Sequence, residues 1–165
     1  MPARPPALTI QPVRNGRGLV ARRTFARGAC ITRLQGTVVH SDVLWTWWKR
    51  DARRAANCIR FDTDRYLNPE GELGAFSNHS CKPNAALFKE RGRLVLRAIR
   101  AIRAGDEVTH DYSTLLGADD VWTMCCNCGE RGCRGTVRRF DALPAATLRR
   151  YLALGAIPAF ILRTR

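Results

Sequence analysis

Long hydrophobic runs are missing from this sequence of 165 residues. Nowhere do about 18 apolar residues follow one another without a charge, which is the length that a membrane-spanning helix needs. The N-terminal segment includes Arg4 and several prolines, and it lacks the run of roughly 7 to 15 apolar residues found in a secretion signal. The sequence therefore predicts a cytoplasmic protein without a membrane partner.

Internal repeats are absent and helical periodicity is scarce. Short apolar, β-branched runs bounded by Gly, Pro, Asn or Asp recur instead, which is typical of strands. A polar segment containing glycine, residues 89–93, predicts a hairpin loop. With 45% apolar residues the chain can form one core, so we expect one mainly β domain with few helices. The expected strands are Leu8–Val13, Leu19–Ala21, Cys30–Leu34, Cys58–Phe61, Tyr66–Leu67, Ala85–Phe88, Leu94–Ala98 and Glu107–His110.

Two segments have helical spacing. The first begins at Asp42, a good capping residue, and continues to Ala56 with apolar residues four positions apart. The second begins at Pro144 and ends at Gly155, a residue that often terminates helices. Both helices should bury one face. The residues expected to pack are Trp45, Trp47 and Trp48 in the first and Leu148, Tyr151 and Leu152 in the second.

Acidic residues are scarce in the N-terminal third. Residues 1–54 contain 11 basic and 2 acidic side chains, whereas residues 55–140 contain 13 and 11, within a total net charge of +14. Such an excess favours acidic partners, and nucleic acid, with nucleoid or chromatin association, is one of them. The other interpretation is a solvated, arginine-rich surface.

The seven cysteines are unevenly spaced. Cys126, Cys128 and Cys133 place three thiolates in a short loop that contains glycine, a spacing that suits a metal better than disulfides. A closed structural zinc site needs four ligands, so a fourth must come from elsewhere, and Cys125 adjoins the group as a competitor. We expect a reducing compartment, with Cys30 and Cys58 buried as apolar residues.

Four segments together resemble the SET-domain lysine methyltransferases. The two signature segments are Asn78–Asn84 and Gly105–Tyr112; Gly16–Ala21 is similar to the family's opening glycine turn, and Cys126–Gly135 to its post-SET zinc segment. The compact chain, without a pre-SET cysteine cluster, is most similar to small bacterial SET proteins. The resemblance implies a β-clip-like fold with a knot-like threaded active site. It divides the chain into a SET domain (1–114), a post-SET zinc-binding segment (115–140) and a C-terminal helical extension (141–165).

The resemblance also implies site residues. The methyl donor of the family, S-adenosylmethionine, would be contacted by Arg17, Gly18, Asn78 and His79 and by Tyr112. Tyr112 matches the catalytic tyrosine. The fourth ligand of a structural zinc ion would be Cys81, which completes a set with Cys126, Cys128 and Cys133. The aromatic residue that stacks on adenine is either Phe140 or Trp122.

The implied reaction is transfer of methyl groups to a lysine side chain of a protein. A lysine ammonium has a reference pKa near 10.4, so removing its proton at pH 7 costs about 4.6 kcal/mol, a cost that a dry channel lowers. One alternative is a catalytically silent basic zinc module that binds nucleic acid or chromatin, and another is transfer to a small-molecule or ribosomal-protein amine. His110 stands where the family often has Phe or Tyr, so the number of methyl groups stays open, as do the substrate and the oligomeric state.

Overall fold

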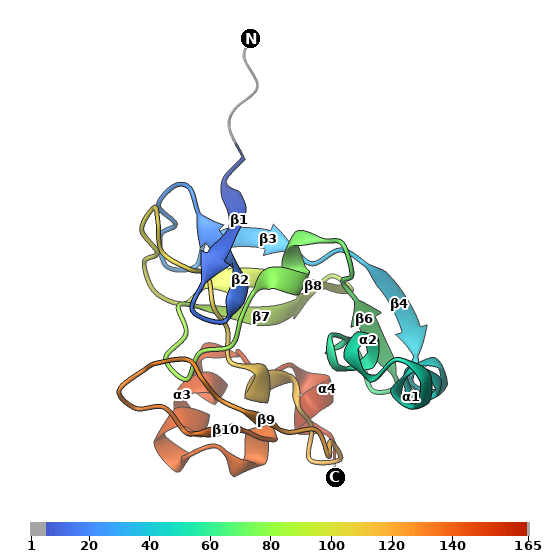
Figure 1. Cartoon of the computed structure of the whole chain (residues 1–165). Helices are drawn as coiled ribbons and strands as arrows, with labels where there is room; N and C mark the ends of the chain where they lie inside the picture. The colour runs from blue at the N-terminus through green and yellow to red at the C-terminus, as the bar shows by residue number, and fades with distance from the viewer. Residues whose placement is uncertain (1–5, 165) are drawn as a thin grey trace.

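The computed structural model describes residues 6–164 and consists mostly of short antiparallel strands (Figure 1). This confirms the mainly β expectation; Arg4 lies outside the described residues. The sheets have the strand orders β1-β2, β3-β8-β7, β4-β6-β5 and β10-β9. The strand bounds are β1 Leu8–Val13, β2 Gly16–Ala21, β3 Cys30–Arg33, β4 Thr37–His40, β5 Ile59–Arg60, β6 Arg65–Asn68, β7 Ala85–Glu90, β8 Arg93–Ala98, β9 Met124–Cys125 and β10 Thr136–Val137.

The main core lies between β1-β2 and the β3-β8-β7 sheet. Alternation along β8 places Leu94 and Leu96 in this core, both without exposed surface, because side chains on a strand point to opposite faces in turn. The loop at Phe25 closes the core through paired backbone bonds with Ile102, at 2.8 and 2.9 Å. Residues far apart in sequence therefore build one core.

The β7-β8 hairpin has a tighter loop than the expected 89–93. The strands continue to Glu90 and restart at Arg93, so the turn consists of Arg91 and Gly92. Both residues have positive φ, 46° and 74°, the combination that a two-residue turn matching the strand twist requires. The hairpin prediction is thus confirmed, with a shorter turn.

The expected strand Glu107–His110 is wrong as a regular strand. Its residues bond in turn to two neighbours: Val108 donates to Leu19 of β2 at 2.7 Å, and Thr109 accepts from Ala85 of β7 at 3.0 Å. Since no single partner strand runs alongside, only isolated bridges form, at Glu107 and His110. The segment therefore joins the two halves of the main core.

The tryptophan helix is broken in two, as α1 (Ser41–Arg50) and α2 (Ala52–Ala56). Asp51 ends α1 and caps α2, because its carboxylate accepts from the Arg54 amide at 3.1 Å. The prediction that the tryptophans pack is wrong for Trp45, which is 56% exposed. The ring of Trp47 lies under the Arg54 guanidinium. These helices and the β4-β6-β5 sheet form the right side of Figure 1.

The C-terminal segments pack on the opposite side of β7 from the main core. The second expected helix is confirmed as α3 (Ala145–Leu154), ended by Gly155 in the left-handed region with φ 63°. Its Tyr151 is 1% exposed in a second cluster that also contains Ala86 of β7 and Phe160 of α4 (Ala159–Leu162). Leu152 was expected on the buried face but is 45% exposed, so this prediction is wrong.

Three single-turn helices complete the described chain, η1 (Leu73–Phe76), η2 (Tyr112–Leu115) and η3 (Phe140–Ala142). Among residues 6–164, no helix combines the length and apolar character needed to cross a membrane. The domain boundaries at 114 and 140 stay predictions. The second hydrophobic cluster contains residues of η3, α3 and α4 together with Ala86 and Ile99, which lie before the boundary at 114.

Candidate active site and cysteine cluster

The two signature segments meet in space. His79 and His110 form a parallel bridge, in which Ser80 donates to the His110 carbonyl and His110 donates to the Asn78 carbonyl, both at 3.1 Å. This pairing brings Asn78, His79 and Tyr112 together, as the resemblance implied. The knot-like threading itself stays a prediction.

Asn78 ties this centre to the glycine turn. Its amide nitrogen donates to the Arg17 carbonyl at 3.2 Å and to Glu107 Oε1 at 2.8 Å. Gly18 is confined from the same side, since a Cβ there would lie 2.5 Å from Glu107 Oε1. The structure therefore brings together Arg17, Gly18 and Asn78. It adds Glu107, whose carboxylate could have been singled out from its place in the second signature segment.

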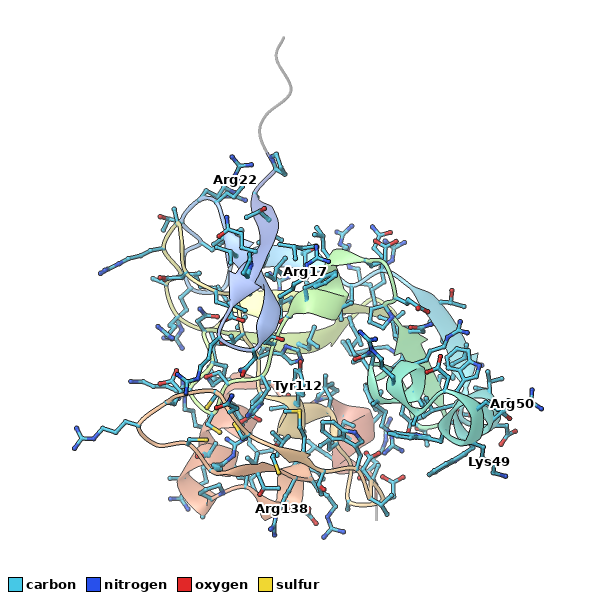
Figure 2. The ribbon with its side chains drawn as sticks, in the orientation of Figure 1. Arg17, Arg22, Lys49, Arg50, Tyr112 and Arg138 are labelled. Carbon is cyan, nitrogen blue, oxygen red and sulfur yellow. The ribbon has the colours of Figure 1, made fainter. Side chains whose placement is uncertain are left out.

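Tyr112 lies near the centre of the molecule (Figure 2). Its hydroxyl donates to the Ser77 carbonyl at 3.1 Å, and its ring contacts His110, with the ring centroids 4.8 Å apart. Burial, helped by the negative charge of Glu107, raises the pKa of Tyr112 to about 12. The phenol is therefore protonated near neutral pH and can take part in hydrogen bonds as donor and acceptor.

The side chain of His79 is buried within this network. Its Nδ1 accepts from the Tyr112 amide at 3.2 Å, so the proton resides on Nε2, which faces Cys81 Sγ at 3.4 Å. Burial lowers the pKa of His79 to about 4 against the opposing pull of Asp111, so the ring is neutral at pH 7. Both ring nitrogens are thus engaged inside the protein.

His110 is buried on the other side of Tyr112. Its Nδ1 lies 2.9 Å from the Ser77 hydroxyl, and the residue is 3% exposed. Burial, followed by the neighbouring His79, lowers the pKa of His110 to about 3. A neutral imidazole therefore stands beside the Tyr112 ring.

A cavity of about 810 Å³ opens beside Tyr112. Its aromatic walls come from α1, β6, η2 and the segment after η2. The charged residues of the wall are one arginine and three aspartates, which give a formal charge of −2. Arg60 pairs with Asp119 and Asp120 at 2.6 and 3.0 Å. The walls of this cavity are acidic and aromatic although the protein has a net charge of +14. Such a cavity suits a positively charged polypeptide segment. The aromatic wall residues are Trp45, Trp48, Tyr66, Tyr112 and Trp122.

The two candidates for stacking on adenine lie in different places. Trp122 lines the cavity, and its ring centroid lies 6.5 Å from that of Tyr112. Phe140 packs instead against the second hydrophobic cluster. The adenine-stacking assignment stays a prediction.

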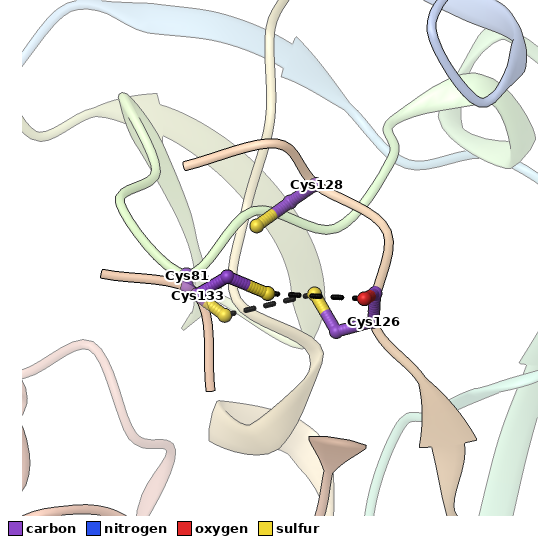
Figure 3. A group of neighbouring side chains, drawn as sticks. All are labelled: Cys81, Cys126, Cys128 and Cys133. Atoms are coloured by element: carbon purple, nitrogen blue, oxygen red, sulfur yellow. Dashed lines mark hydrogen bonds between the residues drawn. The ribbon is translucent and has the colours of Figure 1, made fainter. Parts of the chain in front are cut away.

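The four cysteines of the implied zinc set come together (Figure 3). The Sγ atoms of Cys81, Cys126, Cys128 and Cys133 all lie within 4.8 Å of one another, and those of Cys81 and Cys126 are 3.7 Å apart. Four thiolates about 2.3 Å from a tetrahedral zinc ion would be about 3.8 Å apart. The cluster could therefore hold a metal ion of this kind.

The electrostatics differ within the cluster: burial raises the pKa of the Cys81 and Cys126 thiols, whereas the pKa of the Cys128 thiol is lowered. Burial raises the pKa of Cys128, but backbone N–H donors and the neighbouring thiols outweigh burial and lower the pKa to about 7. The other cysteines stand apart from this group. Cys125 lies on β9 outside it, Cys30 is exposed instead of buried, and Cys58 is half-buried beside the cavity. For Cys30 and Cys58 the expected burial is therefore wrong.

Arg134 and Tyr151 are two residues that the sequence analysis did not connect with the site. Both contact the carboxylate of Asp111, the neighbour of Tyr112. Arg134 directly follows the last cysteine of the cluster, which is a signal, but its partner could not be read from spacing.

Comparison with known proteins gives a consistent family. The chain is 33% identical to "Histone-lysine N-methyltransferase, H3 lysine-4 specific" of Mycosarcoma maydis, over 71% of the chain and 9% of that protein. It is 30% identical to the human "Histone-lysine N-methyltransferase 2B", over 73% of the chain and 5% of that protein. It is also 30% identical to "Histone-lysine N-methyltransferase ASHH3" of Arabidopsis thaliana, over 76% of the chain and 36% of that protein. The chain thus spans a minor part of each relative.

The family model described as SET domain matches residues 16–113. The match contains the glycine turn and both signature segments, and it ends before the cluster cysteines of the C-terminal part. Since the matched range is more than half of the chain, the chain belongs to the SET domain family.

Proposed function

We propose that this chain transfers methyl groups from S-adenosylmethionine to lysine side chains of a protein substrate. The observation that carries the proposal is the position of Tyr112, whose side chain lines an acidic, aromatic cavity while its backbone is bonded to His79 of the other signature segment. The names of the relatives, all histone-lysine methyltransferases, support the same reaction.

The Tyr112 hydroxyl acts by orientation. Because its hydrogen is donated to the Ser77 carbonyl, its lone pairs remain to accept an N–H from the substrate amine. That hydrogen bond would direct the nitrogen lone pair toward the methyl carbon, and alignment of this kind can supply several kcal/mol. Burial beside the neutral Tyr112 and His110 disfavours a charged amine and so lowers the cost of losing the proton, against the opposite effect of the aspartates in the cavity wall.

The donor would bind at the corner made by Arg17, Gly18, Asn78 and His79. At Gly18 a Cβ would lie 2.5 Å from Glu107 Oε1 and 2.6 Å from Val13, so only glycine allows the turn to pack this closely against the residues that hold Asn78. The Asn78 amide is fixed by two acceptors, and the His79 ring is used internally, which leaves its backbone for the donor. When bound, S-adenosylmethionine supplies an activated methyl group on a sulfonium.

We infer that the cysteine cluster binds a structural zinc ion as a post-SET site. The sulfur separations match a tetrahedral set, and no ligand position is left for water, so the metal would hold the C-terminal segment in place without activating a nucleophile. The Asn-His-Ser-Cys segment would thereby be fastened to residues 126–133.

The proposal is tested by Tyr112→Phe. Labelled-methyl transfer from S-adenosylmethionine into a whole-cell protein extract identifies a substrate, and turnover on that substrate is then compared between the two proteins. We expect the rate to fall roughly 10²- to 10³-fold, as on loss of one oriented hydrogen bond. Donor affinity by calorimetry and zinc content should hardly change. Near wild-type turnover with rate-limiting chemistry would reject Tyr112 as the catalytic residue.

The second candidate is a basic zinc module that binds nucleic acid, with nucleoid or chromatin association of a cytoplasmic, bacterial-type protein. It is favoured by the basic side chains on the periphery, among them Arg22, Arg50 and Arg138, which point outward (Figure 2). A protein with a filled metal site and no measurable affinity for millimolar S-adenosylmethionine would support this candidate instead.

A further inference from the structure

The carboxylate of Asp111 is buried where three segments meet. The Arg134 guanidinium donates two parallel hydrogen bonds to it, both 2.7 Å long, and the Tyr151 hydroxyl donates to Oδ2 at 2.9 Å. The amide of Ser113 adds a bond to Oδ1 at 3.1 Å. The Asp111 side chain has no exposed surface, so these donors replace water completely.

Such a carboxylate depends on its partners. An unpaired buried charge costs several kcal/mol, whereas a bidentate guanidinium with further donors offsets that cost. Arg134 supplies the charge, and Tyr151 supplies a neutral donor of fixed direction from α3. Both partners come from segments that follow the matched SET domain range, residues 16–113.

Asp111 in turn fixes the start of the segment that carries Tyr112. It caps η2 through the Ser113 amide, in the way that an N-terminal cap fixes the first turn of a helix. The Tyr112 amide is held separately by His79. Because the amides of Tyr112 and Ser113 are both held in this way, the direction of the Tyr112 ring depends on the position of the Asp111 carboxylate.

The same centre is tied to the cysteine cluster. The Arg134 amide donates to Cys81 Sγ at 3.4 Å, and His79 Nε2 reaches the same sulfur at 3.4 Å. The cluster thus locates Arg134 and His79 together, and each of them contacts the Asp111-Tyr112 pair.

We propose that Arg134 and Tyr151 are positioning residues for Tyr112, and that α3 is a working part of the active site through the Tyr151 hydroxyl. The inference rests on the proposed function of Tyr112. Neither residue lines the cavity, and the side chains of both contact Asp111. A displacement of a reacting geometry by about 1 Å can lower a rate roughly 10²-fold, so a small shift of Tyr112 is sufficient for a measurable effect.

The test compares Tyr151→Phe with Phe160→Leu. The first variant keeps the ring in the second cluster and removes only the hydroxyl, whereas the second weakens the same cluster without touching Asp111. For Tyr151→Phe we expect kcat to fall about tenfold, with KM for protein and donor within about twofold, because substrates bind elsewhere. Phe160→Leu should leave kcat unchanged below its melting temperature.

Arg134→Lys gives a second arm. It keeps the positive charge but loses the bidentate geometry, so we expect a larger fall in kcat, roughly tenfold to hundredfold, at unchanged zinc content. A purely electrostatic role would be rescued by lysine. Full activity of Arg134→Lys, or equal losses in Tyr151→Phe and Phe160→Leu, would overturn the proposal.

Tyrosine-ring NMR separates this inference from the proposed function. The chain has three tyrosines, so the ring signals can be assigned by substitution. We expect the Tyr112 signal to shift in Tyr151→Phe and to stay in Phe160→Leu. A shift in a protein that transfers no methyl group would support positioning while rejecting the proposed function, and an unshifted signal would overturn the positioning role.

Discussion

On one side Tyr112 is held by buried polar groups from distant parts of the chain, whereas on the other it faces a cavity with exposed walls. His79, Asp111, Arg134 and Tyr151 are bonded to one another or to Tyr112 on the first side. On the second side, α1 has ten residues, of which Leu44 is buried, and its Trp45 is largely exposed at the cavity.

Under the proposed function, the difference separates two tasks. Aligning an amine with a methyl carbon requires a fixed group, and a fully satisfied buried network provides it. Accepting a protein segment requires a surface that can adjust, and exposed aromatic side chains with few fixed contacts allow this. The three predictions below act on one side or the other.

The largest effect should come from the cysteine cluster. Cys81→Ser removes one of four thiolates and the sulfur that Arg134 and His79 contact, so we expect the free energy of unfolding to fall by more than about 4 kcal/mol. Urea denaturation with zinc present measures it. Cys30→Ser, at an exposed thiol, is the control and should change stability by less than about 0.5 kcal/mol. Equal effects of the two substitutions would contradict a structural metal.

An intermediate effect is expected from His110. The unfolded residue binds a proton below its usual pKa of 6.5, while the folded one does so only near about 3, so its contribution is complete above pH 6.5 and is lost as the pH falls toward 3. The loss is about 1.4 kcal/mol per pH unit within that window. His110→Asn cannot titrate and keeps a partner for Ser77. Stability curves of the two proteins that run parallel between pH 6 and about 4 would refute this.

The smallest effect on folding should come from the cavity side. Trp45→Ala removes a 56% exposed side chain and should change the free energy of unfolding by less than about 0.5 kcal/mol, while its neighbour Leu44→Ala, 5% exposed, should cost about 2 to 5 kcal/mol. With Trp45→Ala we expect KM for the protein substrate to rise severalfold and kcat to stay. An unchanged KM would remove Trp45 from substrate binding.

Local patterns predicted the parts of this molecule that depend on near neighbours. The turn at Gly92 and the end of α3 at Gly155 follow from backbone conformations that favour glycine. The meeting of Cys81 with the later cysteines was implied by family resemblance, because spacing alone left the fourth ligand open. The prediction that Trp45 packs was wrong because an apolar residue at helical spacing is buried only if another element covers it.

The polar network could not be predicted in the same way. Tyr151 was expected to pack, and it does, but the pattern of α3 says nothing about the partner of its hydroxyl. Asp111 lies 40 residues earlier. Glu107 was expected in a strand, and nothing in that pattern indicated that its carboxylate would accept a hydrogen bond from Asn78. Pairings between distant polar atoms depend on the finished fold.

The separation of Cys81 from Cys126 by 45 residues also has a kinetic consequence. A loop of that length must close before four thiols can meet, and closure costs chain entropy that is recovered only when the contacts form. At the proposed zinc site, metal capture would therefore come late in folding. Until then the thiols of the nascent cluster are open to oxidation, so a reducing environment protects the folding chain more than the finished protein.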